Sequence, residues 1–111
     1  EIHYFLLAIP KKEDVNQINF NLINFNLDNF DNLNLGITRI ELGDTSLLKV
    51  GTFSGAGNAV IYRDVFLKHP EILKGFDPKE ISGFLISESN FLKLIDDKDI
   101  VKYYLYYENH Y

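Results

Sequence analysis

Residues Thr45–Lys68 have the sequence TSLLKVGTFSGAGNAVIYRDVFLK, which has the pattern of a strand followed by a turn and a helix. Apolar and β-branched residues dominate Leu47–Phe53, which predicts a strand that is buried on at least one face. Ser54 follows as the expected N-cap of a helix, because its hydroxyl can accept from the free amides of a first helical turn. Helical spacing then relates three apolar residues, Ala59, Tyr62 and Phe66. We therefore expect a strand, a tight turn and an amphipathic helix that ends before Pro70.

Three further strands are predicted on either side of this unit. Ile2–Ile9 is apolar on both alternating faces, which is typical of a central strand covered on both sides. Ile37–Leu42 precedes Leu47–Phe53 by a short turn-forming segment, Gly43–Ser46, so we expect the two to form a hairpin. Ile81–Ser87 forms the last strand, with Gly83 at a point of close packing or a bulge.

The segment after the first strand is ambiguous. Ile18–Leu27 repeats INFNL twice, and its alternation of Asn with apolar residues imitates a strand. Helical spacing nevertheless relates Val15, Ile18, Leu22 and Phe25, and Asp14 can cap a helix there. We predict a helix, with the Asn residues as either a compositional bias or a feature with a purpose.

The resulting order, β-α-β-β-α-β, predicts an α+β fold of the ferredoxin-like type, with an antiparallel sheet and both helices on one face. We expect one domain, residues 1–111, divided into a core of 1–88 and a helical tail of 89–111. In the tail, Asn90 is expected to cap a turn over Phe91–Ile95, and Asp97 or Asp99 to cap a last helix.

The last helix carries an unusual number of tyrosines. Helical spacing relates Ile100 to Tyr103, Tyr104, Tyr107 and Tyr111. A bare ferredoxin-like sheet leaves one face open, so we expect these rings to pack across that face or around its edge. The alternative is an exposed docking patch, which suits the amphipathic character of tyrosine, and the two roles are compatible.

Composition limits the possible partners. The chain has 111 residues and a net charge of −5, which argues against nucleic acid, since phosphate binding needs a basic surface. It contains no cysteine, which excludes disulfides and thiolate chemistry. No apolar run approaches the roughly 20 residues of a membrane span. Because Glu1 opens directly onto a strand, we expect this to be a piece of a larger chain whose targeting signal lies elsewhere.

No catalytic motif is recognisable. Residues Gly55–Val60 lie where a dinucleotide fingerprint would start, but Val60 replaces its third glycine. The three histidines lack a carboxylate partner at metal-ligand spacing, and the acidic cluster Asp96–Asp99 lacks the pattern of a calcium loop. A small ferredoxin-like isomerase or oxygenase would need polar groups converging on a pocket, and the sequence places none. We therefore expect that this chain is not an enzyme and that it has no catalytic, cofactor-binding or metal-binding residues.

Four groups of residues carry a family resemblance over nearly the whole chain. They are Phe25-Asn26 with Phe30; Lys49–Phe53 with Ala59 and Tyr62; Phe84–Ser87 with Asn90-Phe91; and the closing run Tyr103–Tyr111. Together they resemble the C-terminal domain of the Bacteroidetes tetratricopeptide-repeat lipoproteins of the SprE/PorW type, which belong to the type IX secretion and gliding-motility machinery. The resemblance implies a periplasmic domain, tethered to the outer membrane through a lipid anchor far upstream, that makes protein contacts.

A second resemblance covers only the middle of the chain. Val50–Ser54, followed by Ala59 and Tyr62, is similar to the strand and helix of SPOR domains, which bind peptidoglycan glycans on their sheet. The chain departs from that pattern at Gly55 and Gly57, and in its first strand.

These observations lead to two functional expectations. The first is a non-catalytic interaction domain of the secretion or gliding machinery; the alternative is a SPOR-like glycan-binding domain. The candidate partner-binding residues are Tyr103, Tyr106, Tyr107 and Tyr111, together with the hairpin edge. The candidate structural residues are Phe25, Phe30, Val50, Phe53, Ala59, Tyr62, Phe66 and Phe91.

Overall fold

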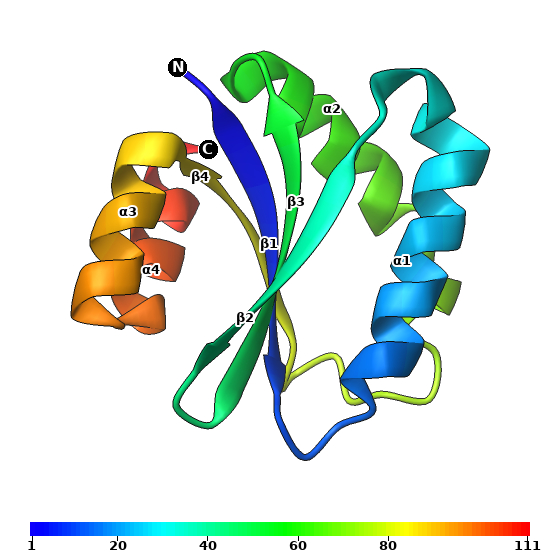
Figure 1. Ribbon diagram of the computed structural model, residues 1–111, viewed down its shortest axis with the longest axis horizontal. Coiled ribbons are helices and arrows are strands. Elements are labelled where there is room, and N and C mark those ends of the chain that lie inside the picture. The colour runs from blue at the N-terminus through cyan, green and yellow to red at the C-terminus, as the bar shows by residue number, and fades with distance from the viewer.

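A computed structural model describes all 111 residues. Its strands form one antiparallel sheet in the order β2-β3-β1-β4 (Figure 1). The elements are β1 (His3–Pro10), α1 (Val15–Phe30), the 3-10 turn η1 (Asp31–Leu33), β2 (Gly36–Leu42), β3 (Thr45–Phe53), α2 (Ala56–Leu67), η2 (Pro70–Leu73), β4 (Ser82–Ser87), α3 (Glu88–Asp97) and α4 (Ile100–His110). The predicted α+β class is confirmed, and the strand order is that of a ferredoxin-like sheet.

The first strand is central, as its two apolar faces predict. It pairs with β3 on one side and β4 on the other, and every residue from His3 to Ile9 is buried. One of its faces, with Phe5, Leu7 and Ile9, enters a core shared with α1 and α2. The other face, with Tyr4, Leu6 and Ala8, enters a second core. The sheet is therefore the middle of three layers.

The repeated INFNL segment is helical throughout. Asp14 caps it, as predicted, because its carboxylate accepts from the amide of Gln17 at 3.1 Å. Helix α1 buries Val15, Ile18, Leu22 and Phe25, which are the residues that the helical spacing selects. Burying that row decides against a strand, because it contributes more than the poor helix propensity of Asn costs.

Two predicted caps are wrong. Helix α2 is preceded by Gly55 in an extended conformation without a side-chain cap, and the Ser54 hydroxyl instead accepts from the Asn58 side chain at 2.7 Å. Helix α3 begins at Glu88, directly after β4, so Ser87 caps it by accepting from the amide of Asn90 at 3.2 Å. The N-cap of α2 therefore lies one residue after the expected Ser54, and that of α3 lies three residues before the expected Asn90. Asp99 does cap α4.

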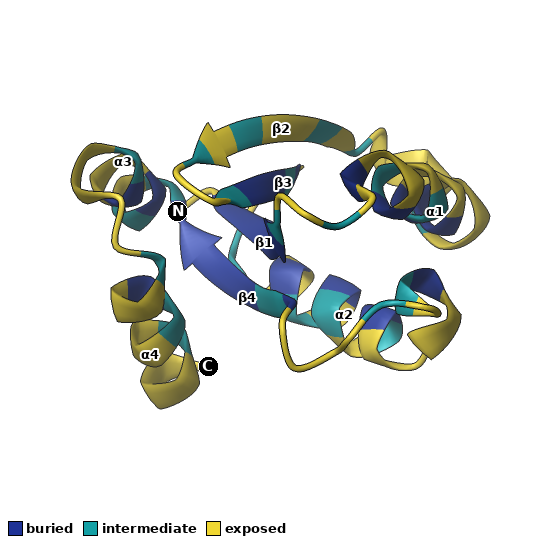
Figure 2. Cartoon of the chain, turned by 90° about the horizontal axis from the view of Figure 1, so that it is seen from below, coloured by how far each residue is buried: buried dark blue, intermediate teal, exposed yellow.

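The tail forms two helices that cover the second face of the sheet and the edge beside β4. Figure 2 shows α3 and α4 on the opposite side of the sheet from α1 and α2. The second core combines residues of β1, β3 and β4 with Phe91 and Leu94 of α3 and Tyr103 of α4. Tyr107 contacts both cores, because α4 lies along the edge of the sheet. The tail thus packs across the face and around its edge, as expected.

Candidate interaction surfaces

The four tyrosines proposed as partner contacts occupy different environments. Tyr103 is only 5% exposed, and its hydroxyl donates to Asp97 Oδ2 at 2.7 Å. Tyr107 is half-buried, with its ring 6.3 Å from that of Phe84. Tyr106 and Tyr111 are 44% and 37% exposed. Tyr103 is therefore corrected from a contact residue to a core residue, because the apolar face of the sheet needs a ring at this position.

Two of these tyrosines fasten the tail to the rest of the chain. The Tyr111 hydroxyl lies 2.7 Å from His3 Nε2, and Arg63 Nη1 of α2 donates to the Tyr107 hydroxyl at 3.3 Å. The Asp97 carboxylate, at the end of α3, has a lowered pKa, chiefly because the Tyr103 hydroxyl donates to it. These contacts hold both ends of α4 in place.

Tyr106 is the most exposed ring of the four, and it belongs to a surface between α3 and α4. Its ring stacks on that of His110, with the ring centres 3.9 Å apart. Both rings line a depression of about 380 Å³, together with Leu105 and Lys93. We call Lys93, Leu105, Tyr106 and His110 the tail surface. It combines apolar area with a stacked aromatic pair, and aromatic residues are common in protein-contact sites.

The candidate structural residues lie in the cores. Tyr62 is fully buried at the centre of an aromatic cluster, with the rings of Phe5, Phe25, Phe30 and Phe53 between 5.0 and 5.5 Å away. Phe66 lies against Phe25 and Phe5, while Val50 and Ala59 are fully buried beside the cluster. Phe91 packs in the second core, with its ring 5.5 Å from that of Tyr4.

Asn26 is a buried polar residue that the sequence reasoning missed. The Tyr62 hydroxyl donates to its Oδ1, and burial raises the pKa of Tyr62 well above its ordinary value. The signal was present, since Asn26 lies four and eight residues after Leu22 and Ile18 on the apolar side of α1. The general richness in Asn concealed it.

A groove separates the outer side of α1 from the start of β2. It has a volume of about 370 Å³, and we call it the α1–β2 groove. Its lining residues are Asn19, Ile23, Asn26, Leu27 and Phe30 of α1, with Asp31, Asn34, Leu35 and Ile37. Two of its polar atoms, Asn19 Oδ1 and Asn26 Nδ2, are buried without a hydrogen-bond partner. The sequence predicts only a structural role for Phe30, and no pattern in it indicates the groove.

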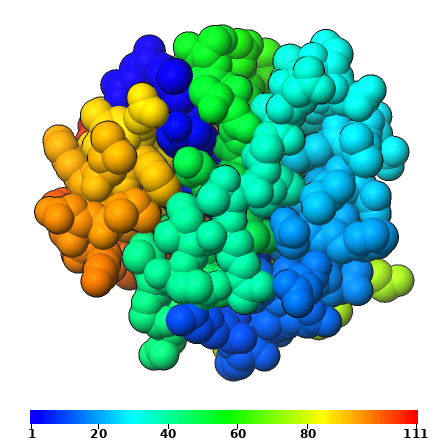
Figure 3. Space-filling model, viewed as in Figure 1, coloured from blue at the N-terminus to red at the C-terminus, as the bar shows by residue number.

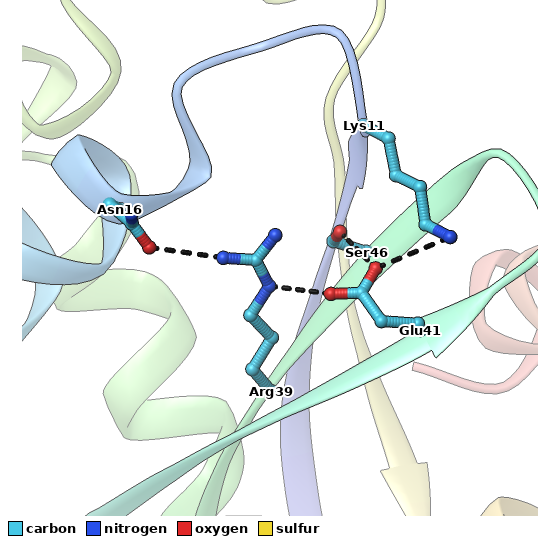
Figure 4. Close-up of polar contacts among 5 residues, drawn as sticks. All are labelled: Lys11, Asn16, Arg39, Glu41 and Ser46. Carbon is cyan, nitrogen blue, oxygen red and sulfur yellow. Dashed lines mark hydrogen bonds and ion pairs between the residues drawn. The ribbon is translucent and has the colours of Figure 1, made fainter.

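A polar network joins the second half of β2 to the start of α1 (Figure 4). Arg39 donates from Nε to Glu41 at 2.6 Å and from Nη1 to Asn16 at 3.0 Å. Glu41 also accepts from the Ser46 hydroxyl at 2.6 Å and lies 3.7 Å from Lys11 Nζ. Its pKa is lowered, mainly by the Ser46 hydroxyl and then by Arg39. The charged side chains therefore lie at the hairpin end of β2, away from the groove.

The second sheet face, where the SPOR resemblance implies a ligand, is largely covered. Helices α3 and α4 pack over β1 and β4, and Lys49 Nζ lies over the rings of Tyr4 and Phe91 at 4.5 and 4.8 Å. What stays open beside them is a depression of about 120 Å³ near Thr38 and Thr52. That depression is small and has a single aromatic wall.

No group of three or more His, Asp or Glu side chains is placed to hold a metal ion. None of the helices combines the length and apolar character that crossing a membrane requires. Comparison with known protein families, curated proteins and solved structures finds no match to this chain.

Proposed function

We propose that this chain is a non-catalytic protein-interaction domain of an outer-membrane-associated periplasmic component of the type IX secretion and gliding machinery. The sequence resemblance to the SprE/PorW-type lipoproteins, which extends over nearly the whole chain, supplies the system and the location. The tail surface is the observation that supports the mode of action. In this proposal, the parent lipoprotein holds the domain at the membrane, and the domain holds a protein component of the complex.

The tail surface supports a contact role because its residues are not needed for the fold. Tyr106 contributes its ring to neither core, and Leu105, one residue earlier, is 52% exposed. The neighbouring Tyr103 and Tyr107 fix the helix that presents them. A rigid helix that presents an aromatic ring at little entropic cost is a favourable anchor for a partner.

Glycan binding is less well supported. The sheet face that would carry the glycan is filled by apolar side chains of the tail, and the remaining depression is small. The exposed tail surface therefore supports protein contact better than the small depression on the sheet supports glycan binding.

Retention of envelope proteins by the immobilised chain tests this proposal. We expect the chain to retain a component of the secretion or gliding complex, and a Tyr106→Lys variant to lose it. Leu67→Lys is the matched control, since Leu67 is an apolar residue on α2 that is 67% exposed and lines neither the tail surface nor the α1–β2 groove. Equal retention by both variants, or retention of no component of the complex, would contradict the proposal.

A further inference from the structure

The α1–β2 groove lies beside an unpaired sheet edge. Strand β2 is the outermost strand and pairs only with β3. In an antiparallel pair, alternate residues direct their N–H and C=O groups away from the partner strand. Counting from the two-residue turn Gly43–Asp44 places Ile37 among the outward residues, and Ile37 also lines the groove. Backbone groups and apolar side chains are therefore available at the same place.

This half of the edge lacks the usual protection. Edge strands commonly avoid unwanted pairing by carrying charged residues. In β2, both charged residues, Arg39 and Glu41, lie in the hairpin half and are paired with each other, whereas Gly36–Thr38 carries none. Figure 3 looks onto this face, where α1 and β2 form adjacent parts of the surface.

The buried side of the groove is polar in a specific way. Asn26 is only 7% exposed, yet its Nδ2 has no partner, and the Oδ1 atom of Asn19 is likewise unpaired. An unpaired buried amide is costly, so a ligand that supplies the missing partner gains from it. Asn26 Nδ2 can donate and Asn19 Oδ1 can accept, so the two match the C=O and N–H groups of a peptide backbone.

Charge and length restrict the occupant further. Asp31 is the single charged residue that lines the groove; neither it nor the nearby Asp28 forms an ion pair, and α1 contains no Lys or Arg. The α1 side of the groove, from Asn19 to Phe30, spans about 17 Å at the rise of a helix, which is the length of about five extended residues.

We propose that the α1–β2 groove binds a short extended segment of a partner protein, which adds to the sheet as a strand beside β2. The segment alternates apolar and small polar residues, so that its apolar side chains contact Ile23 and Leu27 while its backbone pairs with Ile37. A Lys or Arg at one end lies near Asp31. Because the unpaired Asn atoms are covered in the free chain, the exposed side chains at the rim rotate aside on binding.

The test is a titration of the whole chain, labelled with ¹⁵N, with a panel of blocked pentapeptides. In each peptide Val, Ile or Leu alternates with Thr, and Lys or Glu occupies one end. Saturating shifts are expected at the amide of Ile37 and at the side-chain NH₂ of Asn26. Lys-ended peptides should bind more tightly than Glu-ended ones, and methylation of the peptide's backbone nitrogens should abolish binding.

A matched pair of variants separates peptide binding in the groove from non-specific binding to exposed apolar residues. Leu27→Lys places a charge in the groove at a residue 56% exposed, so the fold should persist, and we expect affinity to fall about tenfold or more. Leu67→Lys makes the same change on α2, at a residue 67% exposed and outside the groove, and should bind like the unchanged chain. Circular dichroism checks that both variants are folded.

The inference is overturned if no peptide gives saturating shifts in the groove at millimolar concentration, or if both variants bind alike. The inference rests on the proposed role in protein contact, but the two proposals can fail independently. A domain that retains its partner through Tyr106 and ignores every peptide refutes the groove alone. A domain that binds peptides and retains no secretion component refutes the assignment to that machinery alone.

Discussion

Replacing Tyr103 by Ala should show that the tail is part of the cooperative fold. Tyr103 is 5% exposed in the second core, and its hydroxyl donates to Asp97. Removing a buried aromatic ring costs about 3–5 kcal/mol, which is a large part of the roughly 5–15 kcal/mol that stabilises an ordinary domain. Tyr103→Phe keeps the ring and loses only the hydrogen bond, for about 1 kcal/mol.

The matched control lies three residues further along the same helix. Tyr106 is 44% exposed and belongs to neither core, so Tyr106→Ala should cost about 0.5 kcal/mol or less. Urea denaturation, followed by circular dichroism for the helices and by tyrosine fluorescence, gives the free energy of unfolding of each variant. Equal costs for the Ala variants at Tyr103 and Tyr106, or helix loss in a separate earlier transition of the unchanged chain, would refute the second core as a part of the fold.

Three further predictions concern stability. Burial raises the pKa of Tyr62, so above about pH 10 the unfolded chain releases a proton that the folded chain keeps. The free energy of unfolding should therefore be unaffected below about pH 10 and fall above it. Tyr62→Phe should reduce the slope of that fall by up to about 1.4 kcal/mol per pH unit, as measured by urea denaturation at alkaline pH. Gly83→Ala should cost about 1–3 kcal/mol by urea denaturation, because a Cβ there would lie 3.0 Å from Cζ of Phe5; an unchanged midpoint would show that this ring can move. Asp14→Ala should cost about 1 kcal/mol as the loss of an N-cap while Ser54→Ala costs almost nothing, and the reverse order in the same assay would contradict the cap assignments.

The order of the elements could be predicted because it depends on local patterns. The apolar run of β1, the hairpin turn at Gly43 and the helical spacing of Ala59, Tyr62 and Phe66 each determine a structure over a few residues. The helix ends were harder, since several residues that can cap lie close together. At the start of α2, for example, a turn at Gly55 decided which residue is the cap, and Ser54 bonded to a side chain instead.

The candidate sites depend on distances that a sequence does not contain. Tyr103 and Tyr106 are both part of an aromatic run, and helical spacing places Tyr103, but not Tyr106, in one row with Ile100 and Tyr107. The sequence does not contain the position of α4 against β4, which buries Tyr103 and leaves Tyr106 exposed. The α1–β2 groove depends on how far α1 stands from an edge strand. Its unpaired polar atoms belong to Asn19 and Asn26. Helical spacing places Asn26 in the row of Ile18 and Leu22, but nothing in the sequence separates Asn19 from the other Asn residues of the INFNL repeat.

Site-specific photo-crosslinking in living cells tests whether the tail surface contacts a protein of the complex. A photoreactive phenylalanine analogue is placed at Tyr106 in the full parent protein, and at the exposed Leu67 of α2 in a control. We expect the Tyr106 position to crosslink to a protein component of the secretion or gliding complex and the Leu67 position not to do so. Crosslinks from Tyr106 to peptidoglycan alone, or the same protein crosslinks from both positions, would contradict this expectation.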